Sequence, residues 1–209
     1  MVDYKEAFKR PFTNVLKLII GIILSIIPIV NFIATGYHLE CAKTAFTKKF
    51  RLPDWKNFGK LFLNGFLAVV ISLIYLIPVI IILLIFGISI MKDWFQGGLT
   101  SPTQLINILA DFRGIIFVGF LLFILAAYII PMALVGFIED GKFGDAFSKS
   151  IFKKAFTGKY FVVWILMGLY TIILGLILGF IPFVGGSIAG FITSLTSFTA
   201  IGEVYKKIQ

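Results

Sequence analysis

The side chains best suited to chemistry gather in one short segment, 36–43, which reads GYHLECAK. If this segment is helical, His38 and Cys41 lie three residues apart on one face, and Glu40 and Lys43 have the same spacing and can form an ion pair. His38 and Glu40 lie about 200° apart around such a helix, so they cannot bind one metal ion. We therefore expect a structural Glu40–Lys43 pair, with a proton or substrate relay as the alternative, and neither a metal site nor nucleophilic chemistry.

The chain around this segment is strongly apolar. It is 59% hydrophobic and 14% charged, with a mean hydropathy of +1.03, whereas soluble domains are about 45–50% apolar and about 25% charged. A helix needs roughly 20 apolar residues to cross a bilayer, and four runs without a charge reach that length: 18–37, 61–91, 114–138 and 161–202. Because lipid requires backbone groups to be bonded within each segment, this indicates an all-α, polytopic integral membrane protein.

Proline-containing turns divide two of these runs, at 27–30 (IPIV) and 181–184 (IPFV). We predict one domain, 1–209, with six transmembrane helices at about 13–28, 31–46, 63–91, 114–138, 161–180 and 186–205. All but two of the 19 Lys and Arg residues, Lys92 and Arg113, then lie on one side, which the positive-inside rule makes the cytoplasmic side, together with both termini. The first two helices are short, so a re-entrant hairpin over 13–46 is the alternative.

Three basic stretches precede apolar helices and carry aromatic residues at helical spacing: 3–12, 53–62 and 143–160. We predict three amphipathic interfacial helices on the cytoplasmic side, because such helices lie in the membrane plane and attract anionic lipids. Arg10 falls off the apolar face of the first, and Asp54 is placed to cap the second. The expected contacts to lipid headgroups are Lys56, Lys60, Lys149, Lys153 and Lys154. Ordinary cytoplasmic loops that obey the positive-inside rule are the alternative.

The sequence also indicates an internal repeat. FKRPFT at 8–13 resembles FKKAFT at 152–157, and IPIV resembles IPFV. The predicted repeat has three copies, each an interfacial helix followed by a pair of membrane helices, so that the six helices pair as first with second, third with fourth, and fifth with sixth.

Two prolines and several glycines are expected to shape the helices. Pro78 and Pro131 fall inside predicted helices and should kink them, which is a feature of transporters but also of membrane helices generally. Small residues permit close packing between membrane helices, and the candidates are Gly168, Gly175, Gly179, Gly186 and Gly190.

Composition also excludes several classes of function. One cysteine, Cys41, rules out an intramolecular disulfide framework and a cysteine-rich metal site. The net charge of +9 is explained by membrane topology, so nucleic acid is not an expected partner. We expect no catalytic residues and no cofactor.

Nearly the whole chain resembles an uncharacterised, mostly archaeal family, domain of unknown function 4013, and the resemblance is most specific between residues 36 and 78. The resemblance rests on Gly36-Tyr37, Leu52-Pro53-Asp54-Trp55, Phe58, Gly65, Tyr75 and Pro78. The family is distantly similar to the membrane domain found beside some bacterial glycerophosphodiesterases, whose catalytic domain has no counterpart here. The resemblance implies a multi-pass prokaryotic membrane protein and implies no activity.

These features lead to two expectations for function. The first is a non-enzymatic module of the cell membrane that binds anionic lipids, a partner protein or a second copy of itself in a homo-oligomer. The alternative is a transporter or lipid translocator that uses the helices containing Pro78 and Pro131. A solid apolar bundle with basic segments at its rim would favour the first, and a polar cavity between helices would favour the second.

Overall fold

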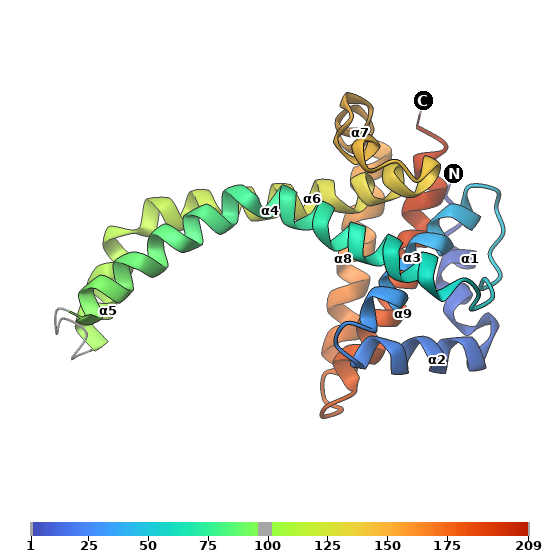
Figure 1. Ribbon diagram of the computed structural model, residues 1–209, viewed down its shortest axis with the longest axis horizontal. Coiled ribbons are helices and arrows are strands. Elements are labelled where there is room, and N and C mark those ends of the chain that lie inside the picture. The colour runs from blue at the N-terminus through green and yellow to red at the C-terminus, as the bar shows by residue number, and fades with distance from the viewer. Residues whose placement is uncertain (1, 96–101, 209) are drawn as a thin grey trace. The chain divides into compact units, whose positions relative to one another are not determined.

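The computed structural model describes residues 2–95 and 102–208, which form two compact units. Unit 1 comprises residues 1–71 and 129–209, and unit 2 comprises residues 72–128. Every regular element in the described ranges is a helix, as predicted (Figure 1). These are α1 (Tyr4–Lys9), η1 (Arg10–Thr13), α2 (Val15–Ile26), α3 (Asn31–Ala45), α4 (Phe58–Phe95), α5 (Pro102–Asp111), α6 (Arg113–Asp140), η2 (Phe143–Phe147), α7 (Lys149–Ala155), α8 (Gly158–Leu178) and α9 (Gly185–Tyr205).

Four helices in the described ranges are long and apolar enough to cross a membrane: residues Phe58–Lys92 of α4, and α6, α8 and α9. Helices also lie at the two remaining predicted positions, but α2 has 12 residues and α3 has 15. At 1.5 Å per residue these two helices are about 18 and about 22 Å long, shorter than a hydrocarbon core of about 30 Å. The chain is therefore a membrane protein by its apolar helices, while the predicted number of six spans is not confirmed.

Helix α9 is the centre of unit 1. Its most apolar stretch is 67% buried, compared with 11% for that of α8, and it packs against α1, α2, α3 and α8. Gly202 of α9 lies so close to α3 that an added Cβ would be 2.4 Å from the carbonyl oxygen of Ala42. The core of unit 1 includes Leu18, Tyr37, Cys41, Phe191 and Leu195.

Glycines also bring α3 and the first turns of α4 together. A Cβ added to Gly36 would lie 1.9 Å from the carbonyl oxygen of Leu61, and one added to Gly65 would lie 1.8 Å from that of Phe32. The prediction for four other glycines is wrong, because no atom comes within 4 Å of a Cβ added there: Gly168, Gly175, Gly186 and Gly190. A Cβ on Gly179 would meet only its own helix, at Gly175 and Leu176.

The two proline-containing turns have the same backbone geometry, which supports the repeat. Ile29 has φ 69° and Phe183 has φ 66°, both in the left-handed region. Each turn is closed by a bond to the carbonyl of its proline, from Val30 at 2.8 Å and from Val184 at 2.8 Å. The hairpins α2–α3 and α8–α9 therefore correspond to each other.

The basic stretches are less regular than predicted. The first forms a helix, α1, which the Asp3 side chain caps by accepting a hydrogen bond from the Glu6 amide at 3.1 Å. The second, 53–62, is helical only from Phe58, where α4 begins, so the predicted helix is wrong for residues 53–57, and Asp54 forms ion pairs instead of a cap. The third is divided into η2 and α7 by an extended residue, Ser148.

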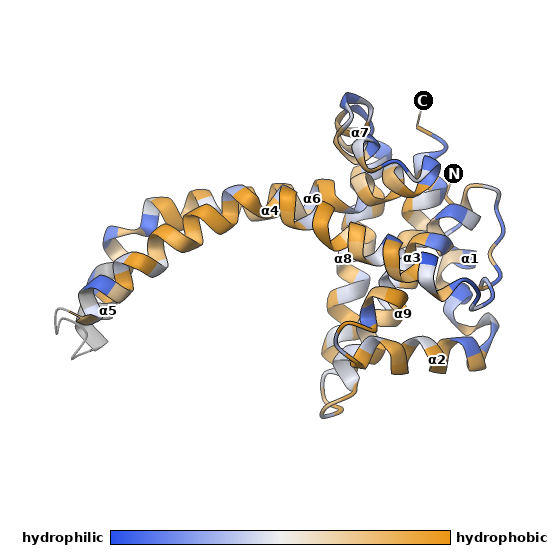
Figure 2. Cartoon of the chain, viewed as in Figure 1, coloured by the Kyte–Doolittle hydropathy of each residue, from blue (hydrophilic) through white to orange (hydrophobic). Residues whose placement is uncertain are grey.

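Unit 2 contains α5, the part of α4 from residue 72 onward and the part of α6 up to residue 128. Hydrophobic residues run along both long helices in Figure 2, and Leu83, Phe117 and Phe120 are among those left exposed. Side chains that would be unfavourable in water suit contact with lipid. Pro78 of α4 lies inside its helix as predicted, and so does Pro131, which belongs to unit 1.

Candidate functional site

The predicted polar segment 36–43 lies within α3, and its two halves face different surroundings. His38 is 7% exposed and Cys41 is fully buried, whereas Glu40 and Lys43 are half-buried. The Lys43 ammonium donates to the carbonyl oxygen of Glu139 at 3.2 Å. The predicted Glu40–Lys43 ion pair is not among the ion pairs of the described residues, so the interpretation of this pair is wrong.

His38 lines a groove of unit 1, which we call the His38 groove, with a volume of about 410 Å³. The polar residues that line it come from three helices and are Ser25, Asn31, Thr35, His38, Ser187 and Ser194. The remainder of the lining is formed by Leu134, Gly186, Gly190, Phe191 and Phe198. The spacing of the residues from α3 puts them on one face of that helix. Within the described residues, no group of three His, Cys, Asp or Glu side chains could hold a metal ion.

Arg10 is a buried cation that the amphipathic pattern misplaces. The pattern puts it off the apolar face, yet it is fully buried. Its Nη1 atom donates to the carbonyl oxygen of Cys41 at 2.8 Å and to the hydroxyl of Thr199 at 3.0 Å, and its Nη2 atom donates to the Thr44 hydroxyl. The carbonyl oxygen of Arg51 lies 3.4 Å from Nη2.

These partners explain how the charge of Arg10 is accommodated. Carbonyl and hydroxyl oxygens near the carboxyl-terminal end of α3 carry partial negative charge, which favours a cation there. Burial lowers the pKa of Arg10, and its Nε atom has no hydrogen-bond partner. The sequence did single out the position of Arg10. In the repeated motifs FKRPFT and FKKAFT, Arg10 corresponds to Lys154. In each copy the final threonine donates to the carbonyl of that basic residue at 2.8 Å.

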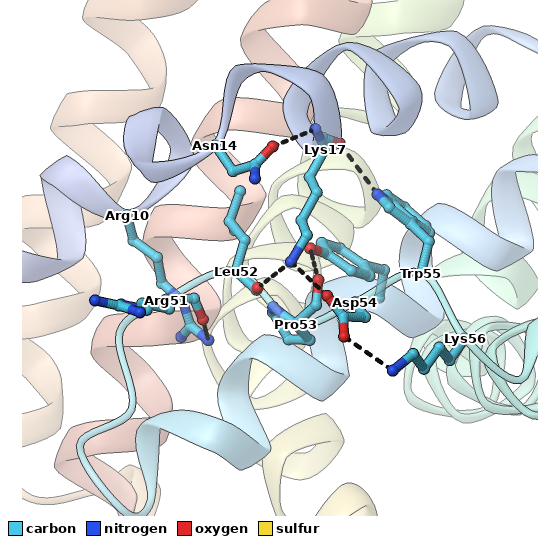
Figure 3. Close-up of polar contacts among 10 residues, drawn as sticks. Arg10, Asn14, Lys17, Arg51, Leu52, Pro53, Asp54, Trp55 and Lys56 are labelled. Carbon is cyan, nitrogen blue, oxygen red and sulfur yellow. Dashed lines mark hydrogen bonds and ion pairs between the residues drawn. The ribbon is translucent and has the colours of Figure 1, made fainter.

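The motif Leu52-Pro53-Asp54-Trp55, which we call the LPDW latch, surrounds the ammonium end of Lys17, a residue of α2 (Figure 3). The Lys17 ammonium donates to the Leu52 carbonyl at 2.9 Å and to Asp54 Oδ1 at 2.8 Å. In return, the Trp55 indole donates to the Lys17 carbonyl at 3.2 Å. The Tyr37 hydroxyl donates to the Pro53 carbonyl at 2.8 Å, and its ring stacks on Trp55 with centroids 3.8 Å apart. Five of the residues that carry the sequence resemblance, Tyr37 and residues 52–55, are therefore connected to one another and to α2.

The electrostatics of the latch depend on Asp54. Hydrogen bonds from Lys17 and Lys56 lower the pKa of Asp54 to about 2. The pKa of an aspartate in an unfolded chain is about 3.9, so the contribution of Asp54 to stability is present above that pH. It is lost as the pH falls through about 2, because the carboxylate is then protonated in the folded state as well.

The five lysines predicted to contact headgroups differ in their surroundings. Lys60, Lys149 and Lys153 are exposed. Lys56 is exposed and pairs with Asp54 at 3.0 Å. Lys154 lies over the ring of Tyr205, 3.7 Å from its centroid, and burial lowers its pKa. Between the lysines of α7, Ile151 is buried and Phe152 is 39% exposed.

A second groove of unit 1 adjoins this basic region, and we call it the Lys159 groove. It has a volume of about 430 Å³ and is lined by Val2, Tyr4, Gly158, Lys159, Val162, Val204 and Lys207. Lys159 is exposed, whereas Lys207 forms an ion pair with Glu203. The lining therefore combines an apolar wall with two ammonium groups, a chemistry that sequence spacing did not reveal. Its residues come from the amino-terminal segment, the start of α8 and the end of the chain.

Comparison with known proteins gives one match. Residues 19–183 match the family described as "Protein of unknown function (DUF4013)". No curated protein and no solved structure matches the chain.

Proposed function

Because the chain belongs to the DUF4013 family, whose description assigns no activity, its function has to be argued from its own site, and we propose a non-enzymatic membrane module that binds anionic lipid. The observation that carries the proposal is the Lys159 groove, where Lys159 and Lys207 border the apolar side chains of Val162 and Val204. An anionic lipid has the complementary chemistry, since its phosphate attracts lysine and its acyl chains suit an apolar wall.

The neighbouring helix α7 supports the same proposal. Ile151 and Ala155 of α7 are buried against the rest of unit 1. Three other side chains of the helix stay exposed: Lys149, Phe152 and Lys153. A basic face that carries exposed aromatic rings is typical of helices at the membrane interface. Figure 2 shows hydrophilic residues on α7 and near both chain ends. We place this module in the cell membrane with its basic segments and both termini in the cytoplasm, in accordance with the positive-inside rule.

The test is retention of lipid by the full-length protein. Replacing Lys149, Lys153 and Lys159 by glutamine should reduce bound phosphatidylglycerol, counted by native mass spectrometry. Each lysine near an anionic surface contributes about 1 kcal/mol, so the triple variant should bind about a hundredfold more weakly. Bound phosphatidylcholine should not change, because it carries no net charge.

The control variant removes the same charge elsewhere, by glutamine at Lys9, Lys48 and Lys49, which are exposed and lie neither in α7 nor in the lining of the Lys159 groove. It should retain phosphatidylglycerol. Equal loss in both variants would show that only total charge matters, and unchanged retention in the first would refute the proposal.

A second candidate function, a transporter or lipid translocator, is favoured by the polar lining of the His38 groove. Pro78 and Pro131 would allow the helices that contain them to bend. Vesicles containing a fluorescent phospholipid decide between the two candidates. A translocator exposes inner-leaflet lipid to external dithionite, whereas a module that only binds lipid protects the inner leaflet.

A further inference from the structure

The lining of the His38 groove is rich in hydrogen-bonding groups. From α3 it receives Asn31, Thr35 and His38, and from α9 it receives Ser187 and Ser194. The Thr35 hydroxyl donates to the Asn31 carbonyl at 3.1 Å, which leaves its oxygen lone pairs as acceptors. Ligand sites typically combine an apolar wall with a few placed polar groups of this kind.

Among these groups, His38 stands out because one of its ring nitrogens lacks a hydrogen-bond partner. The residue is 7% exposed, and its Nε2 atom is buried without a hydrogen-bond partner. Buried polar atoms are almost always bonded to protein or to water, so an orphaned one calls for an explanation. His38 lines the groove although its Nε2 atom has almost no accessible surface, so rotation of the imidazole would be needed to bring a ring nitrogen to a ligand hydroxyl. Such a hydroxyl would then provide the missing partner, because it can both donate to and accept from an imidazole nitrogen.

The charge and shape of the lining limit the class of ligand. None of the described residues that line the groove is charged. An ionised group would lose hydration there without gaining a counter-charge, which is unfavourable. Two aromatic rings lie beside the imidazole, with centroids 4.9 Å away for Phe191 and 6.4 Å away for Phe198. Flat apolar surfaces next to hydrogen-bonding groups suit a ring whose edge carries hydroxyls and whose faces carry C–H bonds.

We propose that the His38 groove binds an uncharged group with several hydroxyls, of the kind found in the sugar headgroup of a glycolipid or in a free sugar. Such a group would hydrogen-bond Asn31, Thr35, His38, Ser187 and Ser194, while Phe191 and Phe198 cover its apolar faces. This site differs from the Lys159 groove in residues and in ligand chemistry, and it does not depend on the proposal made for that groove.

His38 provides a direct test, because it is the only histidine of the chain. Protein labelled with ¹⁵N-histidine and embedded in phosphatidylcholine nanodiscs gives imidazole signals from one residue. Monoglucosyl diacylglycerol in the nanodisc, or methyl glucoside in solution, should shift these signals in a saturable way. A response to the glycolipid alone identifies a lipid headgroup as the source, and a response to methyl glucoside identifies a soluble sugar.

A matched pair of threonine variants tests the geometry. Thr35 lines the groove, whereas Thr171 does not, and both hydroxyls donate to a carbonyl four residues earlier in their helices. Thr35→Val should weaken binding of the responding glucoside about five- to tenfold, as expected for one lost hydrogen bond. Thr171→Val should leave it unchanged. Both folded variants retain the His38 signals as readout.

Three results would overturn the proposal. The first is an absence of any saturable shift with either glucoside. The second is an equal shift with phosphatidylglycerol, which would show that the groove does not distinguish uncharged from anionic groups. The third is unchanged affinity in Thr35→Val. The amount of anionic lipid lost by the variant with glutamine at Lys149, Lys153 and Lys159 affects none of these three results.

Discussion

At the scale of single residues, the buried guanidinium of Arg10 is bound by carbonyl and hydroxyl oxygens in place of a carboxylate. The guanidinium has a planar array of five donors, and the carbonyl of Cys41 and the hydroxyls of Thr44 and Thr199 accept from it. Arg10 thereby ties the segment before α2 to both α3 and α9. A lysine at this position would keep the charge but could not reach separate acceptors in the same geometry.

Arg10→Lys should therefore destabilise the protein by about 2–4 kcal/mol, since several charge-assisted bonds are lost. The buried Cys41 is the only cysteine, so its reaction with a fluorogenic maleimide during a denaturant titration reports unfolding. Lys9→Ala is the control, because Lys9 is exposed and should change stability by less than about 0.5 kcal/mol. Equal midpoints for Arg10→Lys and the unmodified protein would show that these hydrogen bonds contribute little.

Prediction from the sequence was weakest at this scale. Periodicity identifies the face of a helix only while the helix continues, and α1 ends at Lys9, before η1 begins at Arg10. Pro11 follows in η1, so Arg10 no longer follows the 3.6-residue pattern. A different limit applies to Lys43. Its hydrogen-bond acceptor is the carbonyl of Glu139, 96 positions away, and local spacing cannot indicate a contact between residues so far apart in the sequence.

At the scale of the elements, two glycines determine how α3 and α4 meet. Gly36 and Gly65 allow each helix to place its backbone against a carbonyl oxygen of the other, at Leu61 and Phe32. Small residues permit such close approach between helices in membranes. Backbone atoms cannot move aside as a flexible side chain can, so any Cβ at these two positions requires the helices to separate.

Gly36→Ala and Gly65→Ala should each destabilise the protein by about 3 kcal/mol or more, at the upper end of the cost of overpacking, because the added Cβ would meet backbone atoms. Gly168→Ala is a matched control, because it lies inside α8 with open space around it and alanine favours helix over glycine. The measurement is the same titration followed through Cys41. A loss in Gly168→Ala as large as in Gly36→Ala would indicate that helix propensity, and not close packing, governs these sites.

The hydrophobic runs correctly predicted a helix at each of the six positions now occupied by α2, α3, α4, α6, α8 and α9. Apolar helices have a strong compositional signal. The same runs could not predict that 53–57 is not helical, since Trp55 and Phe58 have helical spacing but Asp54 and Trp55 are held by Lys17 and Tyr37 in the LPDW latch. Nor could they show which glycines touch a neighbour. Both features depend on contacts between segments far apart in the sequence.

At the scale of the whole molecule, the central question is how the short hairpin α2–α3 relates to the longer hairpin α8–α9. The turns that close the two hairpins have the same conformation at Ile29 and Phe183. Asn31 and Ser187, which follow these turns, line the same His38 groove. The two turns therefore approach the same end of unit 1, and we expect both to face the same side of the membrane.

Labelling of single cysteines with an impermeant thiol reagent tests this arrangement. In a Cys41→Ser background, Ile27→Cys and Phe183→Cys should react from outside the cell, because both residues are exposed at the turns. Lys149→Cys, exposed on α7, should react only after the membrane is permeabilised, because the positive-inside rule places the basic segments in the cytoplasm. The background variant alone should not react. If Phe183→Cys reacted from outside but Ile27→Cys did not, the turn of α2–α3 would lie within the membrane, as in a re-entrant hairpin, and the four long helices would be the membrane spans.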